Sequence, residues 1–400
     1  MRYVSGPYTQ GQLLKEINEI EMSLTNRFTF GGPITDAAEQ RSWRERVEDA
    51  SFGRNTVLFD DQGNPSVMVV VPAFLEKDVL TGGLNKPHPA FIVNGVVKPY
   101  IYVSKYQSFY TGSGTTLRAI TLKGKDPGVN ITFDNALLAC KQKGAGWHLM
   151  TNAEWAAIAL LCKSRGFMPR GNNNYGKDHS VTTEKGIPAH WYDDSGTKYI
   201  GRVLTGSGPV GWSSDGSPFG IYDLNGNVWE WVGGLRLNNG EIQVLQDNNA
   251  ADNTKDQSAS STEWKAILQD GSLVAPGTTD TLKYDSTGAD SGVFADVGDI
   301  RLSTTITNSL TTSYASNTFE TTQANGGVTV PNLLKLLGLY PIDASHGADG
   351  LYMRNTGERI ALRGGNWSSG SIAGVFCLYL NYVRSFSNVT LGFRSAYIPA

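Results

Sequence analysis

Three cysteines and five histidines are the side chains of this sequence that could support thiol or metal chemistry. The cysteines are Cys140, Cys162 and Cys377. Their small, odd number argues against a disulfide scaffold, and the first two lie in apolar, helix-compatible stretches typical of buried free thiols. The histidines are His88, His148, His179, His190 and His346. None forms the short-spaced pair that binds zinc, and there is no phosphate loop, dinucleotide fingerprint or nucleophile elbow.

The composition excludes several classes of partner. The chain has 400 residues, 18% of them charged, and a formal net charge of -3. General attraction to nucleic acid or to an anionic membrane is therefore not expected. The longest apolar runs, at 67–75 and 155–162, are too short to span a bilayer. The first ten residues lack the basic and apolar regions of a secretory signal. We expect neither a signal peptide nor a transmembrane segment, and no membrane insertion.

The first 60 residues differ from the rest and favour helices. Leu13, Ile17 and Leu24 fall at helical spacing between charged residues, and 37–50 is also helix-compatible. Region 1–60 is interpreted either as a helical adaptor or oligomerisation region, or as helices packed on the neighbouring domain; the pattern does not separate the two.

Short strands and two helices are expected from about residue 56. The strands are predicted at 56–59, 66–74 and 90–102, and the helices at 133–141 and 151–162. Thr151 and Glu154 form a capping box at the start of the second helix. Residues 166–219 are an irregular, loop-rich stretch. Residues 236–349, rich in Thr, Ser, Asn and Gly, indicate an insertion of hairpins and loops, with strands at 241–245 and 299–306 and an apolar segment, 333–340, that docks back. Further strands are predicted at 359–367 and 392–399.

Four segments together resemble the formylglycine-generating-enzyme type of C-type-lectin-like fold. They are GWHLMTNAEW at 146–155, GIYDLNGNVWEW at 220–231, LRGGNW at 362–367 and LGFRSA at 391–396. The resemblance covers roughly 60–235 and 350–400. It implies an α+β, loop-rich ligand-binding domain over 61–400, with the small N-terminal helical region before it and the β-rich insertion 236–349 within it. A fold by itself does not establish a function.

The C-terminal segment 363–400 is more specific. From Arg363 it closely resembles the variable region of target proteins of diversity-generating retroelements. In that family, adenine-directed mutagenesis rewrites codons that keep a pyrimidine third base, which excludes Lys, Glu, Gln, Met and Trp. None of these five occurs between Ser368 and Thr390.

The variable segment divides into two interleaved sets. Gly364, Gly365, Trp367, Leu378, Leu380 and similar small or apolar residues look fixed. The diversified, ligand-binding set is Ser368, Ser369, Ile372, Cys377, Tyr379, Asn381, Tyr382, Phe386, Asn388, Val389 and Thr390. In an extended chain, Leu378 and Leu380 would point inward, and Tyr379 and Asn381 outward. Exposed Tyr379, Tyr382 and Phe386 would supply binding area at low entropic cost; the alternative is that they are ordinary core residues.

The resemblance also raises catalysis and metal binding. The fold family includes copper-dependent oxidases with paired cysteines near the C-terminal strand, and an iron-dependent branch with several histidines. Here the matching stretch offers only Cys377, so no enzyme is expected and no cofactor is required. Carried over by position, a structural calcium ion would be held by the side chains of Asp223 and Glu230 and the carbonyls of Gly226 and Val228; the alternative is a simple turn. Arg394 is expected to pair inside the fold.

The leading hypothesis is therefore a diversified ligand- and receptor-binding protein. The expected partner is a protein or glycan receptor on a bacterial surface, and the expected place is a phage tail (virion) or a cell surface, with the missing leader favouring the phage. Region 1–60 would attach the chain to the virion or make it a homo-oligomer. The alternatives are a formylglycine-type or sulfoxide-synthase-type metal-dependent oxidase, or a non-diversified structural virion protein.

Overall fold

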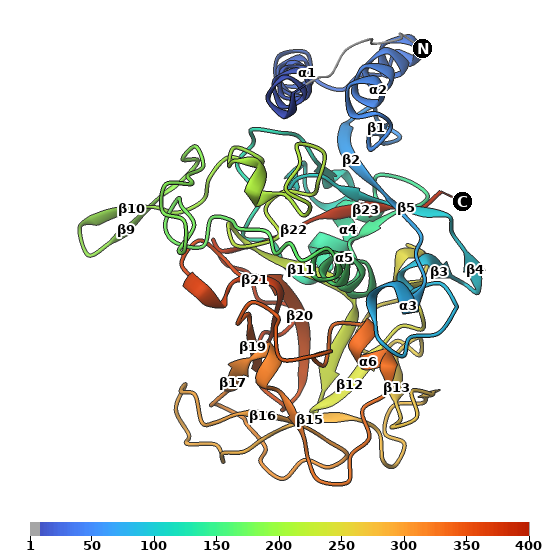
Figure 1. Ribbon diagram of the computed structural model, residues 1–400, viewed down its shortest axis with the longest axis vertical. Helices are drawn as coiled ribbons and strands as arrows, with labels where there is room; N and C mark the ends of the chain where they lie inside the picture. The colour runs from blue at the N-terminus through green and yellow to red at the C-terminus, as the bar shows by residue number, and fades with distance from the viewer. Residues whose placement is uncertain (1–8, 400) are drawn as a thin grey trace.

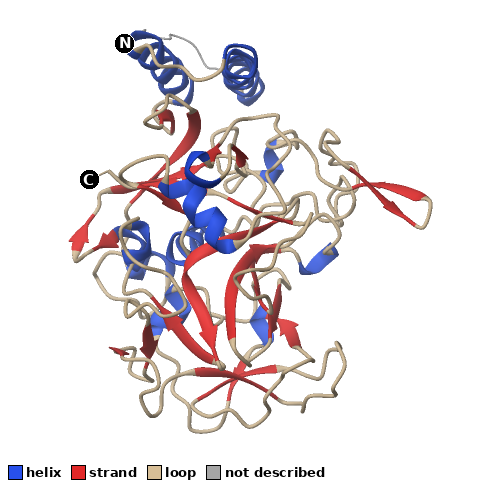
Figure 2. Ribbon diagram, turned by 180° about the vertical axis from the view of Figure 1, so that it is seen from behind, coloured by secondary structure: helices blue, strands red, loops and turns tan. Residues whose placement is uncertain are grey.

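A computed structural model describes residues 9–399 of the chain. Residues 1–8 of the predicted N-terminal region and Ala400 of the predicted variable region lie outside the described part. Figure 1 shows two helices at one end, a mixed body in the middle and the strands of residues 236–349 at the other end. Loops and turns make up a large part of the chain (Figure 2), as the many Gly and Asn residues of the sequence indicate.

The described part contains six α-helices. They are α1 (Gln10–Gly31), α2 (Ala37–Ser51), α3 (Glu76–Val79), α4 (Phe133–Lys141), α5 (Asn152–Ser164) and α6 (Asn332–Leu336). Short 3-10 turns are η1 (Pro89–Phe91), η2 (Gly114–Thr116), η3 (Val210–Trp212), η4 (Asn249–Ala251), η5 (Phe319–Thr321) and η6 (Gly370–Ile372). The predicted helices at 133–141 and 151–162 are confirmed. The capping box at Thr151 is present, because its side chain accepts from the Glu154 N–H while Glu154 accepts from the Thr151 N–H.

The strands are short and numerous. In the first half of the chain they are β1 (Asn55–Phe59), β2 (Pro65–Pro72), β3 (Ile92–Val93), β4 (Val96–Val97), β5 (Tyr100–Ser104), β6 (Phe109–Thr111), β7 (Arg118–Ile120), β8 (Trp147–Leu149), β9 (Trp191–Asp194) and β10 (Thr197–Ile200). In the second half they are β11 (Trp229–Asn238), β12 (Glu241–Val244), β13 (Lys265–Ile267), β14 (Leu273–Val274), β15 (Lys283–Ser286), β16 (Ile300–Ser303), β17 (Ala315–Thr318), β18 (Gln323–Ala324), β19 (Gly350–Met353), β20 (Glu358–Gly364), β21 (Gly374–Leu380), β22 (Leu391–Phe393) and β23 (Ser395–Tyr397).

The first sheet joins the two ends of the domain. Its order is β1-β2-β5-β23-β8, so the last strand of the chain lies between two strands from the first half. Ala396 pairs with Val103 on β5 and with His148 on β8. Figure 1 shows β23 lying beside β5 near the C-terminus. The C-terminal end of the predicted variable region is therefore held inside the domain.

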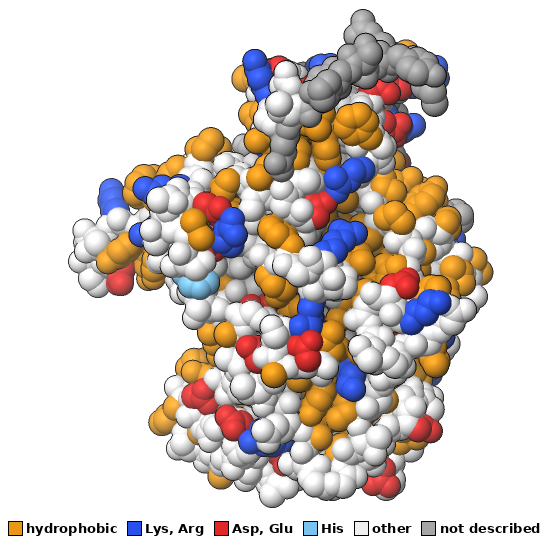
Figure 3. Space-filling view, viewed as in Figure 1, with side chains coloured by type: hydrophobic (Ala, Val, Ile, Leu, Met, Phe, Trp, Pro, Cys, Tyr) orange, Lys and Arg blue, Asp and Glu red, His pale blue; other side chains and the backbone are white. Residues whose placement is uncertain are grey.

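The second sheet carries the predicted variable strand. Its main order is β17-β19-β21-β20-β11-β12-β15-β16-β18. The strands of residues 236–349 continue this sheet on both sides, and β11 runs through residue 236 without a break. Their buried side chains, including Ile242, Leu282 and Leu302, belong to the same apolar core as α5. Figure 3 shows that the outer surface of this end is mostly uncharged and polar, which matches its Ser- and Thr-rich composition.

The predicted docking of the apolar segment 333–340 is confirmed. Leu334, Leu336 and Leu339 are buried, and they belong to the same core cluster as α5. The buried Arg363 guanidinium also donates to the Gly338 carbonyl at 3.0 Å.

Two predicted strands are divided in the structure. The predicted strand 392–399 becomes β22 and β23, which join different sheets, and the predicted strand 90–102 is also divided. Residues 92–97 form the tight hairpin β3–β4, and only Tyr100–Ser104 joins the first sheet. Asn94 and Gly95 turn the chain with φ of 50° and 76°. Gly and Asn adopt left-handed φ angles more readily than other residues, so the Asn94-Gly95 pair was the turn signal that the prediction missed.

The N-terminal helices pack on the domain through a buried ion pair. Glu21 of α1 receives the Lys105 ammonium at 2.8 Å and the Tyr106 hydroxyl at 2.5 Å. Neither charged side chain is exposed, and Lys105 also donates to the Asn55 side chain at 3.0 Å. Burial lowers the Lys105 pKa, and the nearby Glu21 opposes that shift. Helices α1 and α2 are thus seated on the neighbouring domain, while an adaptor or oligomerisation role for 1–60 stays a prediction.

The buried ion pair gives a stability prediction. Replacing Lys105 by Ala leaves the Glu21 carboxylate buried without its cation, which should cost about 3–5 kcal/mol of unfolding free energy. Lys15 is the matched control, because its pair with Glu19 is 77% and 67% exposed. Lys15→Ala should change stability by less than about 0.5 kcal/mol. Urea unfolding measures both, and equal small effects in the two variants would contradict the structural role of the Lys105 pair.

Candidate functional site

The predicted variable residues lie on β21 and on the loops at its two ends. Tyr379 of β21 is opposite Leu362 of β20 and beside Tyr352 of β19. The alternation predicted for β21 is present, because Leu378 and Leu380 are fully buried while Tyr379 between them is half-buried. Two faces of one strand therefore have different environments.

Nine of the eleven predicted residues reach the surface. Ser368 and Val389 are exposed, and the half-buried members are Ser369, Ile372, Tyr379, Tyr382, Phe386, Asn388 and Thr390. The three aromatic residues form a row: the ring centroids of Tyr379 and Tyr382 lie 5.0 Å apart, and Phe386 stacks on Tyr382 at 3.8 Å. The three aromatic side chains are neither fully exposed nor fully buried. Each packs partly against an apolar cluster and is partly open to solvent.

For two of the eleven residues, Cys377 and Asn381, the prediction of a surface position is wrong, because both are buried. Cys377 is 0% exposed and belongs to an apolar cluster with Trp231 and Leu362, which covers β21 at that point. Burial raises the pKa of its thiol well above the usual range. Asn381 is 3% exposed. It follows the end of β21 at Leu380, so the alternation of an extended strand no longer decides its direction.

Aromatic residues outside the variable segment extend the row, and the sequence analysis missed them. Trp229 of β11 and Tyr352 of β19 each lie 5.3 Å from Tyr379 between ring centroids. Tyr314 lies 6.2 Å from Tyr352, and Phe294, which is 63% exposed, lies 5.0 Å from Tyr314. Tyr314 and Phe294 come from the 236–349 segment. The sequence held no signal that these aromatic residues would join the row, because it is the pairing of β19 with β21 that brings Tyr352 beside Tyr379.

Several contacts that hold the backbone of the variable loops come from groups outside the diversified set. The Trp229 N–H donates to the Thr390 carbonyl at 2.8 Å, and the Asn130 N–H donates to the Asn388 carbonyl at 3.0 Å. Arg202 donates to the Val389 carbonyl at 3.2 Å while pairing with Asp126.

Arg384 braces the loop that carries Tyr382 and Phe386. Its guanidinium contacts Glu358 at 2.7 Å and Asp134 at 2.7 Å. Together with the backbone contacts of the variable loops, this ion-pair network supports the loop through side chains that are outside the predicted variable set.

The start of β21 depends on a buried carboxylate. Asp349 accepts the Phe376 N–H at 2.7 Å, and a Cβ on Gly374 would lie 2.1 Å from its Oδ1 atom. Only glycine leaves room for this approach. Burial raises the Asp349 pKa well above its usual range, the Phe376 N–H opposes the shift, and Glu320 adds to it.

The predicted calcium ligands do not form an open cation site. The carbonyls of Gly226 and Val228 and the Glu230 carboxylate converge, but on the side-chain amide nitrogen of Gln107, at 3.4, 3.1 and 3.0 Å. The Asp223 carboxylate turns away and accepts the Gly206 N–H at 2.9 Å. Glu230 is also bound by Arg394, as expected for that arginine. The side chains as they stand therefore do not fit the ion.

The groups considered for thiol or metal chemistry are dispersed. Cys140, Cys162 and Cys377 are all buried free thiols. Within residues 9–399, no group of three or more His, Cys, Asp or Glu side chains is placed to hold a metal ion. Across the same range, no helix has the length and apolar character needed to cross a membrane.

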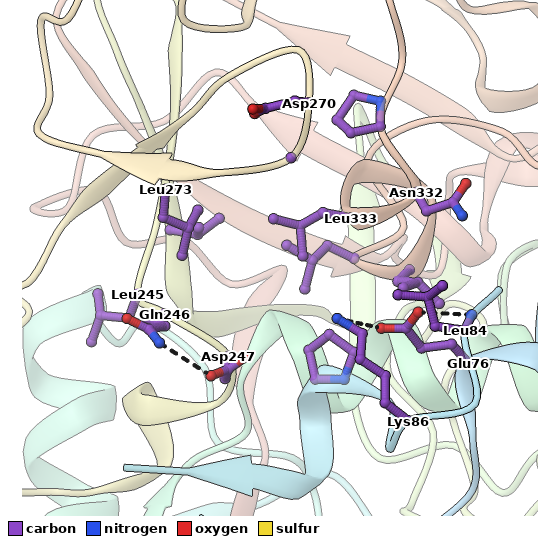
Figure 4. Close-up of a pocket in the computed structure, with 16 residues that line it drawn as sticks. Glu76, Leu84, Lys86, Leu245, Gln246, Asp247, Asp270, Leu273, Asn332 and Leu333 are labelled. Carbon is purple, nitrogen blue, oxygen red and sulfur yellow. Dashed lines mark hydrogen bonds and ion pairs between the residues drawn. The ribbon is translucent and has the colours of Figure 1, made fainter. Parts of the chain in front are cut away.

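A pocket of about 380 Å³ lies elsewhere, between the α3 region, β12–β14 and α6 (Figure 4). Lys86 pairs with Glu76 there at 3.2 Å, and Asp247 and Asp270 also line the pocket. None of the predicted variable residues lines it.

The buried Asp349 predicts a pH-dependent difference between variants. Because its folded-state pKa is raised above the unfolded value of about 3.9, the folded chain binds the proton more strongly, and this group's contribution to stability falls as pH rises from about 4. Asp349→Asn keeps an accepting oxygen for Phe376 but does not titrate. Its unfolding free energy relative to the unaltered protein should therefore increase between about pH 4 and pH 8. A difference that stays constant in urea titrations over this range would contradict the raised pKa.

A protein-family model supports the fold. The family model of the sulfatase-modifying factor enzyme 1-like domain matches residues 80–267. Among solved structures, "Structure of PvdO from Pseudomonas aeruginosa" is 17% identical, with a TM-score of 0.35 and coverage of 86% of this chain and 97% of that one. "Treponema denticola variable protein 1" is 12% identical, with a TM-score of 0.32 and coverage of 86% and 99%. "Major Tropism Determinant P3c Variant" is 12% identical, with a TM-score of 0.29 and coverage of 86% and 71%. No curated protein matched the chain. Residues 80–267 thus match the model of the sulfatase-modifying factor enzyme 1-like domain, and the chain has the α+β, loop-rich C-type-lectin-like fold of the formylglycine-generating-enzyme type.

Proposed function

We propose that this protein is a diversified ligand-binding protein whose variable side chains contact a receptor. The observation that carries the proposal is the division of one backbone into two faces. Leu378 and Leu380 build the core, while Tyr379, Tyr382 and Phe386 on the other side form a continuous, partly open row. The sequence likeness of 363–400 to retroelement-diversified variable regions supports the same function.

The binding surface combines changing and constant parts. Nine outward positions of the variable segment would differ between versions of the protein. Tyr352, Tyr314 and Phe294 continue the row but lie outside that segment, so they would stay constant. Aromatic side chains bring large contact area and lose little rotamer entropy, which suits both parts. We propose a protein or glycan receptor on a bacterial surface as the partner, and a phage tail as the setting, without catalysis.

The backbone contacts explain how such a surface could tolerate change. Affinity is gained when the binding conformation exists before the ligand arrives. Here the loop conformation depends on Arg384 with Glu358, on Arg202 with Asp126, and on main-chain hydrogen bonds. None of these groups is in the diversified set, so substitution there changes the chemistry of the surface more than its shape.

The genome of the source provides the direct test of diversification. We expect a near-copy of the coding sequence for 363–394 close to the gene, beside a reverse transcriptase gene. The two copies should differ at adenines of the template, and the differences should fall in codons of the nine outward positions. Sequencing of several isolates measures this. Identical codons in all isolates, with no second copy, would contradict diversification.

A pair of displayed libraries tests whether the surface tolerates variation. The first randomises Ser368, Ser369, Ile372, Tyr379, Tyr382, Phe386, Asn388, Val389 and Thr390 with codons that end in a pyrimidine. The matched control randomises the inward residues Val375, Phe376, Leu378 and Leu380 with the same codons. Most clones of the first library should resist protease, whereas the control should lose folding because each large-to-small core change costs about 2–5 kcal/mol. Equal loss of resistance in both libraries would contradict the assignment of faces.

A further inference from the structure

Gln107 occupies the centre of a ring of oxygen atoms in the turn 223–230. Its side chain is fully buried, and its amide nitrogen lies 3.2 Å from the Asp223 carbonyl oxygen, 3.4 Å from that of Gly226 and 3.1 Å from that of Val228. The Glu230 Oε1 atom lies 3.0 Å from the same nitrogen. Four oxygens from one short turn around a single point are the arrangement that a hard cation such as calcium prefers. Here a neutral hydrogen-bond donor of the chain itself stands at that point.

The orientation of the Gln107 amide follows from main-chain groups. An amide nitrogen and oxygen are easily exchanged in assignment, so the neighbours must decide between them. The Asn227 Oδ1 atom accepts the Val203 N–H at 2.9 Å, and its Nδ2 atom donates to the Val203 carbonyl at 3.2 Å. Because those two main-chain groups cannot exchange roles, Asn227 presents Nδ2 to the Gln107 oxygen, at 2.9 Å. The Gln107 nitrogen must therefore face the ring of oxygens.

The charges around the ring also favour a neutral donor. Arg394 binds both oxygens of Glu230, at 2.8 and 3.0 Å, and both side chains are buried. The carboxylate that would balance a divalent ion is thus already paired with a cation. The Asp223 carboxylate, the other expected ligand, is directed at the Gly206 N–H and contributes only its main-chain carbonyl to the ring. A calcium ion here would meet a buried guanidinium with too little negative charge between them.

We propose that the Gln107 amide replaces a structural cation in the turn 223–230, so that this chain holds the turn by hydrogen bonds and folds without calcium. The inference is independent of the proposed receptor-binding function. It concerns how the turn before β11 is held, and Trp229, which contacts Tyr379, begins that strand.

Three proteins and two measurements test the proposal. The unaltered chain should have the same melting temperature in millimolar calcium and in EDTA, and it should give no tryptophan-sensitised terbium luminescence. Gln107→Glu puts a carboxylate among the oxygens. It should melt several degrees lower in EDTA, recover much of the loss in calcium, and bind terbium. Gln107→Leu fills similar space without a donor or a charge. It should also melt lower, because the buried oxygens lose their partner, but calcium should not restore it.

Three results would overturn the proposal. Stabilisation of the unaltered chain by calcium, with terbium luminescence at one site, would mean that a cation and not Gln107 holds the turn. If Gln107→Glu shows neither calcium rescue nor terbium binding, or stays unfolded even with calcium, the ring is not shaped for a cation. Equal rescue of Gln107→Leu would place the calcium effect elsewhere in the chain.

Discussion

The buried ion pair between Arg394 and Glu230 is the constraint on which the variable surface depends. Arg394 stands between the last two strands, β22 and β23, and Glu230 lies in β11. The same guanidinium donates to the main-chain carbonyls of Ser104 and Tyr222, each at 2.9 Å. One side chain thus joins both sheets and the turn that precedes β11. A charge buried this deeply is tolerated only with its partners in place, so the end of the chain has one position in the fold.

That position gives the variable segment two fixed ends. It enters through β20, which is held by the buried Arg363, and it leaves through β22, which pairs in parallel with β11. Between them, β21 lies in the interior of the sheet, with β19 on one side and β20 on the other. A strand hydrogen-bonded on both edges keeps its backbone whatever its outward side chains are, because the ladder uses main-chain groups only. The loop that follows has no such ladder, and the ion pairs of Arg384 and Arg202 support it instead.

The segment 236–349 does more than connect the motif at 220–231 to the motif at 362–367. It extends the central sheet and shares its core, and it places Tyr314 and Phe294 at the end of the aromatic row. The N-terminal helices are likewise joined to the domain by a buried charge, Glu21, and not only by apolar contact. Both elements looked peripheral in the sequence. The structure joins them to the domain through contacts with residues distant in the chain, and these contacts leave no periodic pattern in the sequence.

Local sequence determined the elements whose signals are local. The helices at 133–141 and 151–162 follow from apolar spacing and the Thr151 capping box, and the inward direction of Leu378 and Leu380 follows from strand alternation. These properties depend on neighbours within a few residues. The four short motifs also indicated the fold, because each supplies buried groups such as Glu230 and Arg394 that this fold uses together.

Tertiary structure alone decided the limits and the composition of the candidate site. Strand alternation could not show that an apolar cluster covers Cys377, or that β21 ends before Asn381, since both depend on what packs nearby. Tyr352, Tyr314 and Phe294 joined the row through pairing across the sheet. Position 107 lies more than a hundred residues before the turn whose oxygens its amide gathers. Such contacts are set by sheet topology and burial, and no spacing along the chain records them.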